Sequence, residues 1–550
     1  MVHSPDPRRG FPASASSGST AVACRNQASP SRDRIGFSRP ARQIGDPALR
    51  TKPARPQDNP WRHALRRPDA NRARISAAPN RSIPPLTIFS RGATLIVGQD
   101  AARVCACAER LAPWLECLPI VLADGAAMPS IEVRGGQRIL VCRRIKIGGH
   151  FGAFRVKVIG RSGWADLDRF IHGPRLFDLV LDLTPGGVFE GERIPRGFFA
   201  VGGSEQRLAQ ALLDLPESVG VFEKARLIER DPDPCGHAHS GLSGCRRCLQ
   251  ICPCGAVETD GHRPRLDPLV CEGCAACASV CPAGRMRFTQ LPHEDLLTAL
   301  RLTLESHQRP GIVPVPALFQ GEPGSPPPEA VAPPAGIEIV PLNVPEIGCI
   351  GMETLLTALA YGAGGVLVWL PADTPRRLRN NLKAQIHWAG SILEGLGRSA
   401  HSVCMRAAGC GGSGLDDFWP AVQGPAMPAG FSPFHNKRTL VRLAVEHLAE
   451  QSGIEPYAVA LPADAPFGTV VLDHERCSCC RACVDVCAHQ ALQWDSELQA
   501  LKFVEARCTQ CGLCAKLCPE KAIESEPRYL YARRISEMPV VLNSRMPIFM

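Results

Sequence analysis

Aromatic side chains are scarce in this chain. Phe, Trp and Tyr together form only 5% of its 550 residues. Hydrophobic residues at 45% and charged residues at 21% are ordinary for folded domains, and they exclude collagen, coiled-coil and wholly disordered chains. At about 100–200 residues per domain, the length predicts three to five domains.

A dinucleotide-binding fingerprint is also missing. Residues 93–97, 101–114 and 118–122 are predicted to form a strand, a helix and a second strand, but the turn Val97–Ala102 lacks the pattern G-x-G-x-x-G. We therefore expect residues 86–230 to form an α/β domain without an assigned function. A nucleotide or flavin site in this domain stays open as an alternative.

Neither an export signal nor a membrane span is predicted. Arg8 and Arg9 resemble a twin-arginine start, yet no apolar stretch of about 7–15 residues follows them. Residues 354–372 carry no charge, but the glycine-rich turn at 362–365 divides them into a predicted helix and a predicted strand. We expect a cytoplasmic protein.

The positive charge of the chain lies in one segment. Residues 1–85 contain 16 Lys and Arg against 5 Asp and Glu, together with 13 prolines, whereas the whole chain has a net charge of +9. Such a segment buries too little apolar surface to fold, so we predict a disordered basic tail. The remaining residues are close to neutral, and no nucleic-acid partner is expected.

Cysteine, in contrast, is abundant and regularly spaced. Three of the runs formed by the 26 cysteines follow the pattern C-x2-C-x2-C-x3-C: Cys271, Cys274, Cys277 and Cys281; Cys477, Cys480, Cys483 and Cys487; Cys508, Cys511, Cys514 and Cys518. This is the ligand signature of bacterial ferredoxins with two [4Fe–4S] clusters, in which the fourth cysteine binds the other cluster. Disulfides would require an oxidising compartment, and zinc ribbons space their cysteine pairs further apart.

A fourth run is incomplete. Cys245, Cys248 and Cys252 keep the spacing, but Leu242 occupies the position of the first ligand. Cys235 is the nearest earlier cysteine and is predicted to complete the site. The alternatives are another ligand, for which His237 and His239 are nearby, or a cluster with three irons.

Pairing each fourth cysteine with the opposite run predicts four metal sites. Site one is Cys235, Cys245, Cys248 and Cys281; site two is Cys252, Cys271, Cys274 and Cys277; site three is Cys477, Cys480, Cys483 and Cys518; site four is Cys487, Cys508, Cys511 and Cys514. The other ten cysteines are interpreted as ordinary packed thiols. No catalytic residue is predicted.

These motifs carry three resemblances. The two cysteine-rich segments resemble bacterial 8Fe ferredoxins, and together in one chain they are similar to a polyferredoxin. Residues 348–368, which begin Gly-Cys-Ile-Gly-Met-Glu, are similar to the small iron–sulfur subunit that links hydrogenase to heterodisulfide reductase in methanogens. That family carries further cysteines for a [2Fe–2S] centre, but here Trp369 and Leu370 stand where a cysteine is expected. The whole arrangement also looks like bacterial 4Fe–4S proteins associated with formate dehydrogenase.

The predicted fold class is a multidomain α/β chain with two ferredoxin-type α+β 2[4Fe–4S] modules and a disordered N-terminal tail. Alternating strands and helices favour a parallel sheet in the flavodoxin-like docking domain. The expected divisions are a tail (1–85), an α/β domain (86–230), a first module (235–290), a helix and proline-rich linker (291–335), the docking domain (336–465), a second module (470–530) and a C-terminal tail (531–550).

The expected function is a relay of single electrons through four [4Fe–4S] clusters between a redox donor protein and a redox acceptor protein. The chain would be a subunit or partner of a larger redox enzyme, in a formate dehydrogenase- or heterodisulfide reductase-like system. Two alternatives stay open. One is an oxidoreductase subunit with its own nucleotide or flavin site in residues 86–230, and the other is a maturation factor for a metalloenzyme.

Overall fold

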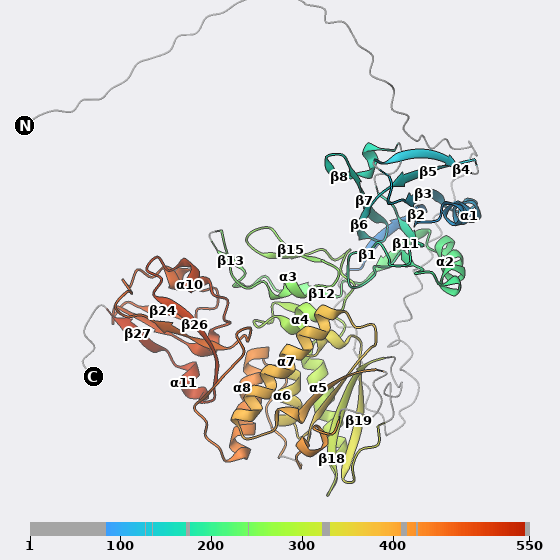
Figure 1. The fold of residues 1–550 in the computed structure, drawn as a ribbon. Helices are drawn as coiled ribbons and strands as arrows, with labels where there is room; N and C mark the ends of the chain where they lie inside the picture. The colour runs from blue at the N-terminus through green and yellow to red at the C-terminus, as the bar shows by residue number, and fades with distance from the viewer. Residues whose placement is uncertain are drawn as a thin grey trace, which may run out of the picture.

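The structure is a computed structural model. It describes residues 84–544 except 127, 135, 172–175, 240, 322–330, 409–414 and 425–426. The predicted disordered tail, apart from its last two residues, and most of the predicted proline-rich linker lie outside the described residues. The described part of the chain is a mixed α/β structure (Figure 1).

The N-terminal α/β domain is built on a sheet with the strand order β10-β9-β2-β3-β5-β4. All neighbouring strands of this sheet are parallel except the antiparallel pair β4–β5: β2 (Ala93–Gly98), β3 (Glu116–Leu122), β4 (Ser130–Arg134), β5 (Gln137–Cys142), β9 (Leu179–Asp182) and β10 (Phe198–Ala200). Two helices cover one face: α1 (Ala101–Leu111) and α2 (Glu205–Glu217). A small antiparallel sheet covers the other: β6 (Ile145–His150), β7 (Ala153–Gly160) and β8 (Gly163–Asp166). β1 (Leu86–Ser90) pairs with β11 (Gly220–Lys224) beside them.

Two segments rich in cysteine share the order strand, helix, two strands, helix, strand, and the first has an additional hairpin. The first cysteine segment (residues 228–288) contains β12 (Ile228–Arg230), the β13–β14 hairpin (Ala238–His239, Leu242–Ser243), α3 (Arg247–Ile251), β15 (Val257–Thr259), β16 (Pro264–Leu266), α4 (Ala276–Val280) and β17 (Met286–Phe288). The second cysteine segment (residues 468–530) contains β23 (Gly468–Leu472), α9 (Ala482–Asp485), β24 (Leu492–Asp495), β25 (Ala500–Phe503), α10 (Leu513–Leu517) and β26 (Ile523–Leu530). In each segment the outer strands pair antiparallel, and so do the two central strands.

The middle domain is a four-stranded parallel sheet in the order β19-β18-β20-β21. Its strands are β18 (Val313–Gln320), β19 (Ile337–Val344), β20 (Val366–Leu370) and β21 (Val403–Ala407), and its helices are α5 (His293–His307), α6 (Met352–Ala360), α7 (Arg376–Gly395) and α8 (Lys437–Ser452). Numbered within the domain, this order is 2-1-3-4. The helices lie together on one side of the sheet (Figure 1).

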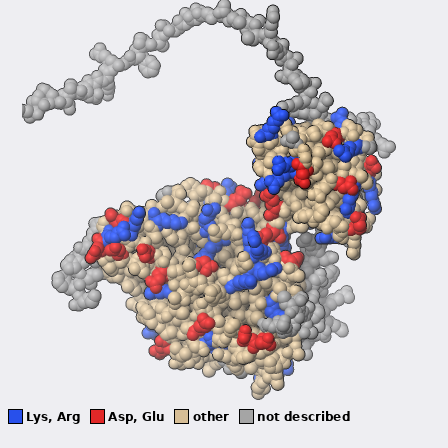
Figure 2. Space-filling view, in the orientation of Figure 1, with Lys and Arg blue, Asp and Glu red and all other residues tan. Residues whose placement is uncertain are grey.

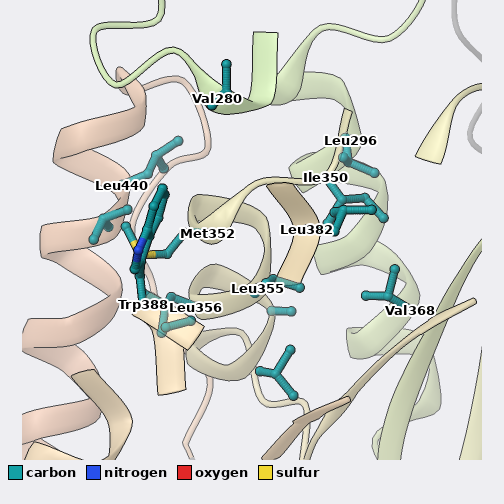
Figure 3. Close-up of a cluster of buried hydrophobic side chains, with 14 of the residues drawn as sticks. Val280, Leu296, Ile350, Met352, Leu355, Leu356, Val368, Leu382, Trp388 and Leu440 are labelled. Carbon is teal, nitrogen blue, oxygen red and sulfur yellow. The ribbon is translucent and has the colours of Figure 1, made fainter. Parts of the chain in front are cut away.

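Helix α6 is the centre of the largest hydrophobic cluster. Every residue of this helix is buried, and Leu355 and Leu356 pack among Trp388 of α7 and Leu440 of α8 (Figure 3). Val280 of the first cysteine segment enters the same cluster, so that segment and the middle domain share one core. The second cysteine segment has a separate, smaller core.

The uncharged stretch 354–372 is therefore divided between α6 and β20, as predicted. Within the part of the chain that the structure describes, no helix combines the length and the apolar character needed to cross a membrane.

Two segments differ from the sequence expectation. Strand β18 was not predicted, and its residues fall in the range expected to hold a helix and a linker. It contains Pro314 and Pro316, and proline disfavours a strand assignment. Both prolines pair with β19 at positions where β20 does not reach, since β20 pairs only from Ala317 onward. The expected C-terminal tail includes α11 (Arg533–Glu537) and β27 (Val540–Ser544), and β27 extends the β24–β25 hairpin.

Charged side chains of both signs are interspersed over the face shown in Figure 2. Arg193 of the N-terminal domain and Glu346 of the middle domain form an ion pair at 2.7 Å. Lys224 of the N-terminal domain also binds Glu272 and the carbonyl of Leu269 in the first cysteine segment. These contacts hold the N-terminal domain against both neighbours.

Candidate metal centres

The three complete cysteine runs share one unusual backbone conformation. The residue before the second cysteine and the residue after it both have positive φ in each run: Gly273 and Ala275, Cys479 and Arg481, Gln510 and Gly512. Residues other than glycine rarely adopt this conformation, so its recurrence at matching positions indicates a common structural requirement. The positive φ values turn the chain so that consecutive cysteines line one side of a tight loop.

A second feature recurs after the fourth cysteine of all four runs. The residue three positions later has positive φ: Gly255, Gly284, Gln490 and Lys521. The resulting turn brings the next backbone N–H onto the sulfur, with N···Sγ distances of 3.2–3.3 Å: Ala256 to Cys252, Arg285 to Cys281, Ala491 to Cys487 and Ala522 to Cys518. Such N–H···S bonds stabilise a negatively charged sulfur and raise the reduction potential of a cluster bound to it.

Electrostatic contacts link the thiols of the cysteine runs. In each group one thiol has its pKa raised by burial and by the charge of the other three: Cys248 by Cys281, Cys245 and Cys235; Cys277 by Cys274, Cys271 and Cys252; Cys483 by Cys477, Cys480 and Cys518; Cys514 by Cys508, Cys511 and Cys487. In each case the neighbours include the fourth cysteine of the opposite run, which is the proximity that a crossed ligand requires.

This environment suits iron–sulfur clusters. Burial raises the pKa of Cys248 and of Cys483 to about 12, so four neighbouring thiols do not ionise together without positive charge among them. Iron supplies that charge and binds thiolate sulfur. Within the described residues, no group of three or more His, Cys, Asp or Glu side chains is placed to hold a single metal ion. A cubane does not require such a group, because each of its cysteines binds a different iron.

Cys235 lies near the incomplete first run. Burial and the charges of Cys281 and Cys245 raise the pKa of the Cys235 thiol to about 11, which places this thiol within site one. His237 has both ring nitrogens engaged, Nδ1 at 2.9 Å from the carbonyl oxygen of Cys245 and Nε2 at 2.8 Å from Thr259 Oγ1. The side chain of His239 lies outside the described residues. Cys235 therefore has the neighbouring cysteines that a ligand at this position requires.

The four sites differ in exposure. All four cysteines of site two are buried, where the N-terminal domain, the first cysteine segment and the middle domain meet. At site three, by contrast, Cys480 is exposed, and Arg481 stacks over Trp494 with its guanidinium carbon 4.4 Å from the ring centre. Site three is thus the site most open to an outside partner.

Several residues around the sites were not singled out from the sequence. Gly348 packs so tightly on the loop of site two that a Cβ there would lie 2.1 Å from the carbonyl oxygen of Cys274. Arg377 donates to the carbonyl of Cys252 at 3.0 Å, and Cys254 Sγ lies 3.9 Å from Cys252 Sγ. Of these residues, only Gly348 lies in a motif noted in the sequence, where the resemblance concerned a [2Fe–2S] centre. In the structure this glycine allows close packing against the loop of site two.

Comparison with known families agrees with this description of the second cysteine segment. Residues 476–522 match the 4Fe-4S dicluster domain family. A ferredoxin-type iron–sulfur domain is therefore present in the chain, and it supports the binding of [4Fe–4S] clusters and a role in electron transfer. No curated protein matches the chain significantly.

Proposed function

We propose that this protein carries single electrons between two redox proteins through four [4Fe–4S] clusters, as a polyferredoxin-like chain with two ferredoxin-type modules. The observation that carries the proposal is the recurring geometry of the cysteine runs, with positive-φ turns and N–H···S bonds at matching positions. Electrostatic contacts between the thiols of paired runs support the same grouping. The family match supports the second module. The strand pairing of the first cysteine segment, and the turns that it shares with the second segment at its complete run and after each fourth cysteine, support a second copy.

In this proposal the sixteen cysteines of sites one to four hold the clusters, which supply one-electron redox chemistry when bound. The surrounding chain has three tasks. Buried apolar residues exclude water, and the four N–H···S bonds stabilise charge on the crossed sulfurs. The helices α3, α4 and α10 each connect a cysteine of one site to a cysteine of the neighbouring site within one turn.

The middle domain is proposed to position the modules and to dock a larger redox enzyme, such as a formate dehydrogenase- or heterodisulfide reductase-like partner. Its support is structural: the first cysteine segment shares its core, and α8 contacts both cysteine segments. The N-terminal domain closes over site two through the ion pair of Arg193 with Glu346.

Anaerobic purification followed by iron and sulfide analysis tests this proposal. Four clusters predict about sixteen irons per chain and low-potential EPR signals on reduction. Fewer than about eight irons per chain, or clusters that pass readily to an apo-protein instead of being reduced reversibly, would contradict an electron carrier.

A further inference from the structure

The two cysteine segments meet at a contact between metal ligands. Gly236, in the loop between Cys235 and β13, is buried against Cys511 of the second segment. A Cβ at this glycine would lie 3.0 Å from Cys511 Cβ, 3.1 Å from Cys511 Sγ and 3.6 Å from His489 Nε2. A side chain at position 236 would therefore displace Cys511.

Gly236 is also hydrogen-bonded to a cysteine of site one. Its carbonyl oxygen accepts a hydrogen bond from the backbone N–H of Cys245, at 2.7 Å. Gly236 thus contacts Cys511 of site four and is hydrogen-bonded to Cys245 of site one. A single residue spans the gap between ligands of two sites that lie in different segments.

Neighbouring residues reinforce this contact. A Cβ on Gly244 would lie 2.7 Å from Leu513 Cγ, and Lys516 of α10 donates to the carbonyl of Ser243 at 2.6 Å. The β13–β14 hairpin accordingly lies beside α10 (Figure 1). The contact combines tight packing with a direct hydrogen bond, and both involve the loops that carry the ligands.

From this geometry we propose that electrons cross between the two modules at the contact of Gly236 with Cys511, from site one to site four or in reverse. The inference rests on the proposed function, because it assumes that both sites hold clusters. One electron leaves one site as the other gains it, and no bond is made and no proton moves. Gly236 is a positioning residue, which sets the distance across the contact.

The contact fixes the order of the whole route. Within each segment one short helix joins neighbouring sites. Helix α4 holds Cys277 and is followed directly by Cys281, and α10 holds Cys514 and is followed directly by Cys518. The order is therefore site two, site one, site four, site three. The route begins at site two, whose cysteines are buried, and its other end is site three, where Cys480 is exposed.

The test uses the full-length, cluster-loaded chain in two versions that each keep two sites. Cys274→Ser with Cys480→Ser leaves sites one and four, and Cys248→Ser with Cys511→Ser leaves sites two and three. After reduction we expect EPR signals split by magnetic coupling in the first version and unsplit signals in the second. Equal coupling in both, or coupling only in the second, would overturn the proposed order.

A second measurement leaves all sixteen cysteines in place. Gly236→Val should widen the contact and slow electron transfer between the modules several-fold after pulsed photoreduction, with unchanged iron content. Gly186→Val is the matched control, because Gly186 has open space around its Cβ position and ordinary φ. An unchanged transfer rate in Gly236→Val at full iron content would contradict the crossing at this contact. A low iron content in the unmodified protein would instead refute the proposed function.

Discussion

Lys437 and Arg438 are consecutive residues that bind different cysteine segments. Lys437 Nζ donates to the carbonyls of Ala278 and Ser279 in α4, at 2.8 and 2.7 Å. Arg438 donates to the carbonyls of Ala506, Pro466 and Cys508 in and beside the second segment, at 2.7–3.0 Å. The first turn of α8, capped by Asn436, therefore holds both segments at once.

Arg438→Met should loosen the second segment selectively. Each hydrogen bond from a charged donor contributes on the order of 1.5–3 kcal/mol, and the loss of all three should destabilise the docked segment by about 3 kcal/mol or more. Hydrogen exchange should then accelerate in residues 505–511. Lys437→Met is the matched variant and should accelerate exchange in α4 instead. Equal effects of both variants on both segments would disagree with separate attachment.

Gly348→Ala should cost the protein one cluster. The new methyl group would meet the carbonyl oxygen of Cys274 at 2.1 Å, and the loop of site two would have to move. We expect iron to fall by about four per chain while the other sites stay filled. Gly424→Ala, with open space at its Cβ position, should keep the full iron content. Retention of all iron in Gly348→Ala would show that the loop tolerates the displacement.

Single ligand substitutions should act on single sites. Cys271→Ser should empty site two, and Cys508→Ser should empty site four, with the remaining signals preserved in EPR and iron analysis. Cys349→Ser serves as the control, since Cys349 is grouped with none of the four sites. Loss of a cluster in Cys349→Ser would reveal a role for this thiol that the grouping does not include.

The pair His293–Glu294 should make stability depend on pH. Burial lowers the pKa of His293, but the hydrogen bonds with Glu294 and with the carbonyl of His435 outweigh it, so the net shift is upward. A raised pKa means that the stabilisation is full below about pH 6.5 and is lost as the pH rises through the folded-state pKa. Thermal midpoints of the protein and of His293→Gln should therefore converge with rising pH. A constant difference across that range would be inconsistent with this pair.

Glu294 has its own pH range. The hydrogen bond with His293 holds the pKa of Glu294 down, at about 2. Its contribution should be present above about pH 4.5 and fall away only as the solution is acidified towards pH 2. Glu294→Gln, compared with the unmodified protein in the same midpoint measurements, should remove that acid-side loss. An acid-side loss that persists in Glu294→Gln would assign it to another group.

Local patterns in the sequence predicted local structure well. Ser204 and Asn436 are of residue types that favour helix starts, and both side chains accept from backbone N–H groups in the first turn. Gly453 ends α8 with φ of +66°. The cysteine spacing predicted a ferredoxin-type domain because its ligands follow one another closely along the chain, and the family match at residues 476–522 confirms it there.

Long-range contacts were not predictable in the same way. Gly236 and Arg438 are ordinary residues in their local sequence, and their partners, Cys511 and Cys508, lie far along the chain. Strand β27 was also missed. It forms by pairing with β25 of the second cysteine segment, and the local sequence of β27 does not reveal that partner. Such contacts depend on how finished elements pack, which no local spacing encodes.

The shared core described for the first cysteine segment ties iron supply to the maturation of the protein. Six of its cysteines belong to the same buried cluster as α6 and Trp388, whereas the second segment packs around its own small core. Metal binding contributes directly to folding free energy where the ligands are part of the core. If sites one and two hold clusters as proposed, scarcity of iron would remove support from the middle domain together with both sites, and metal occupancy would act there as a checkpoint on completion of the fold.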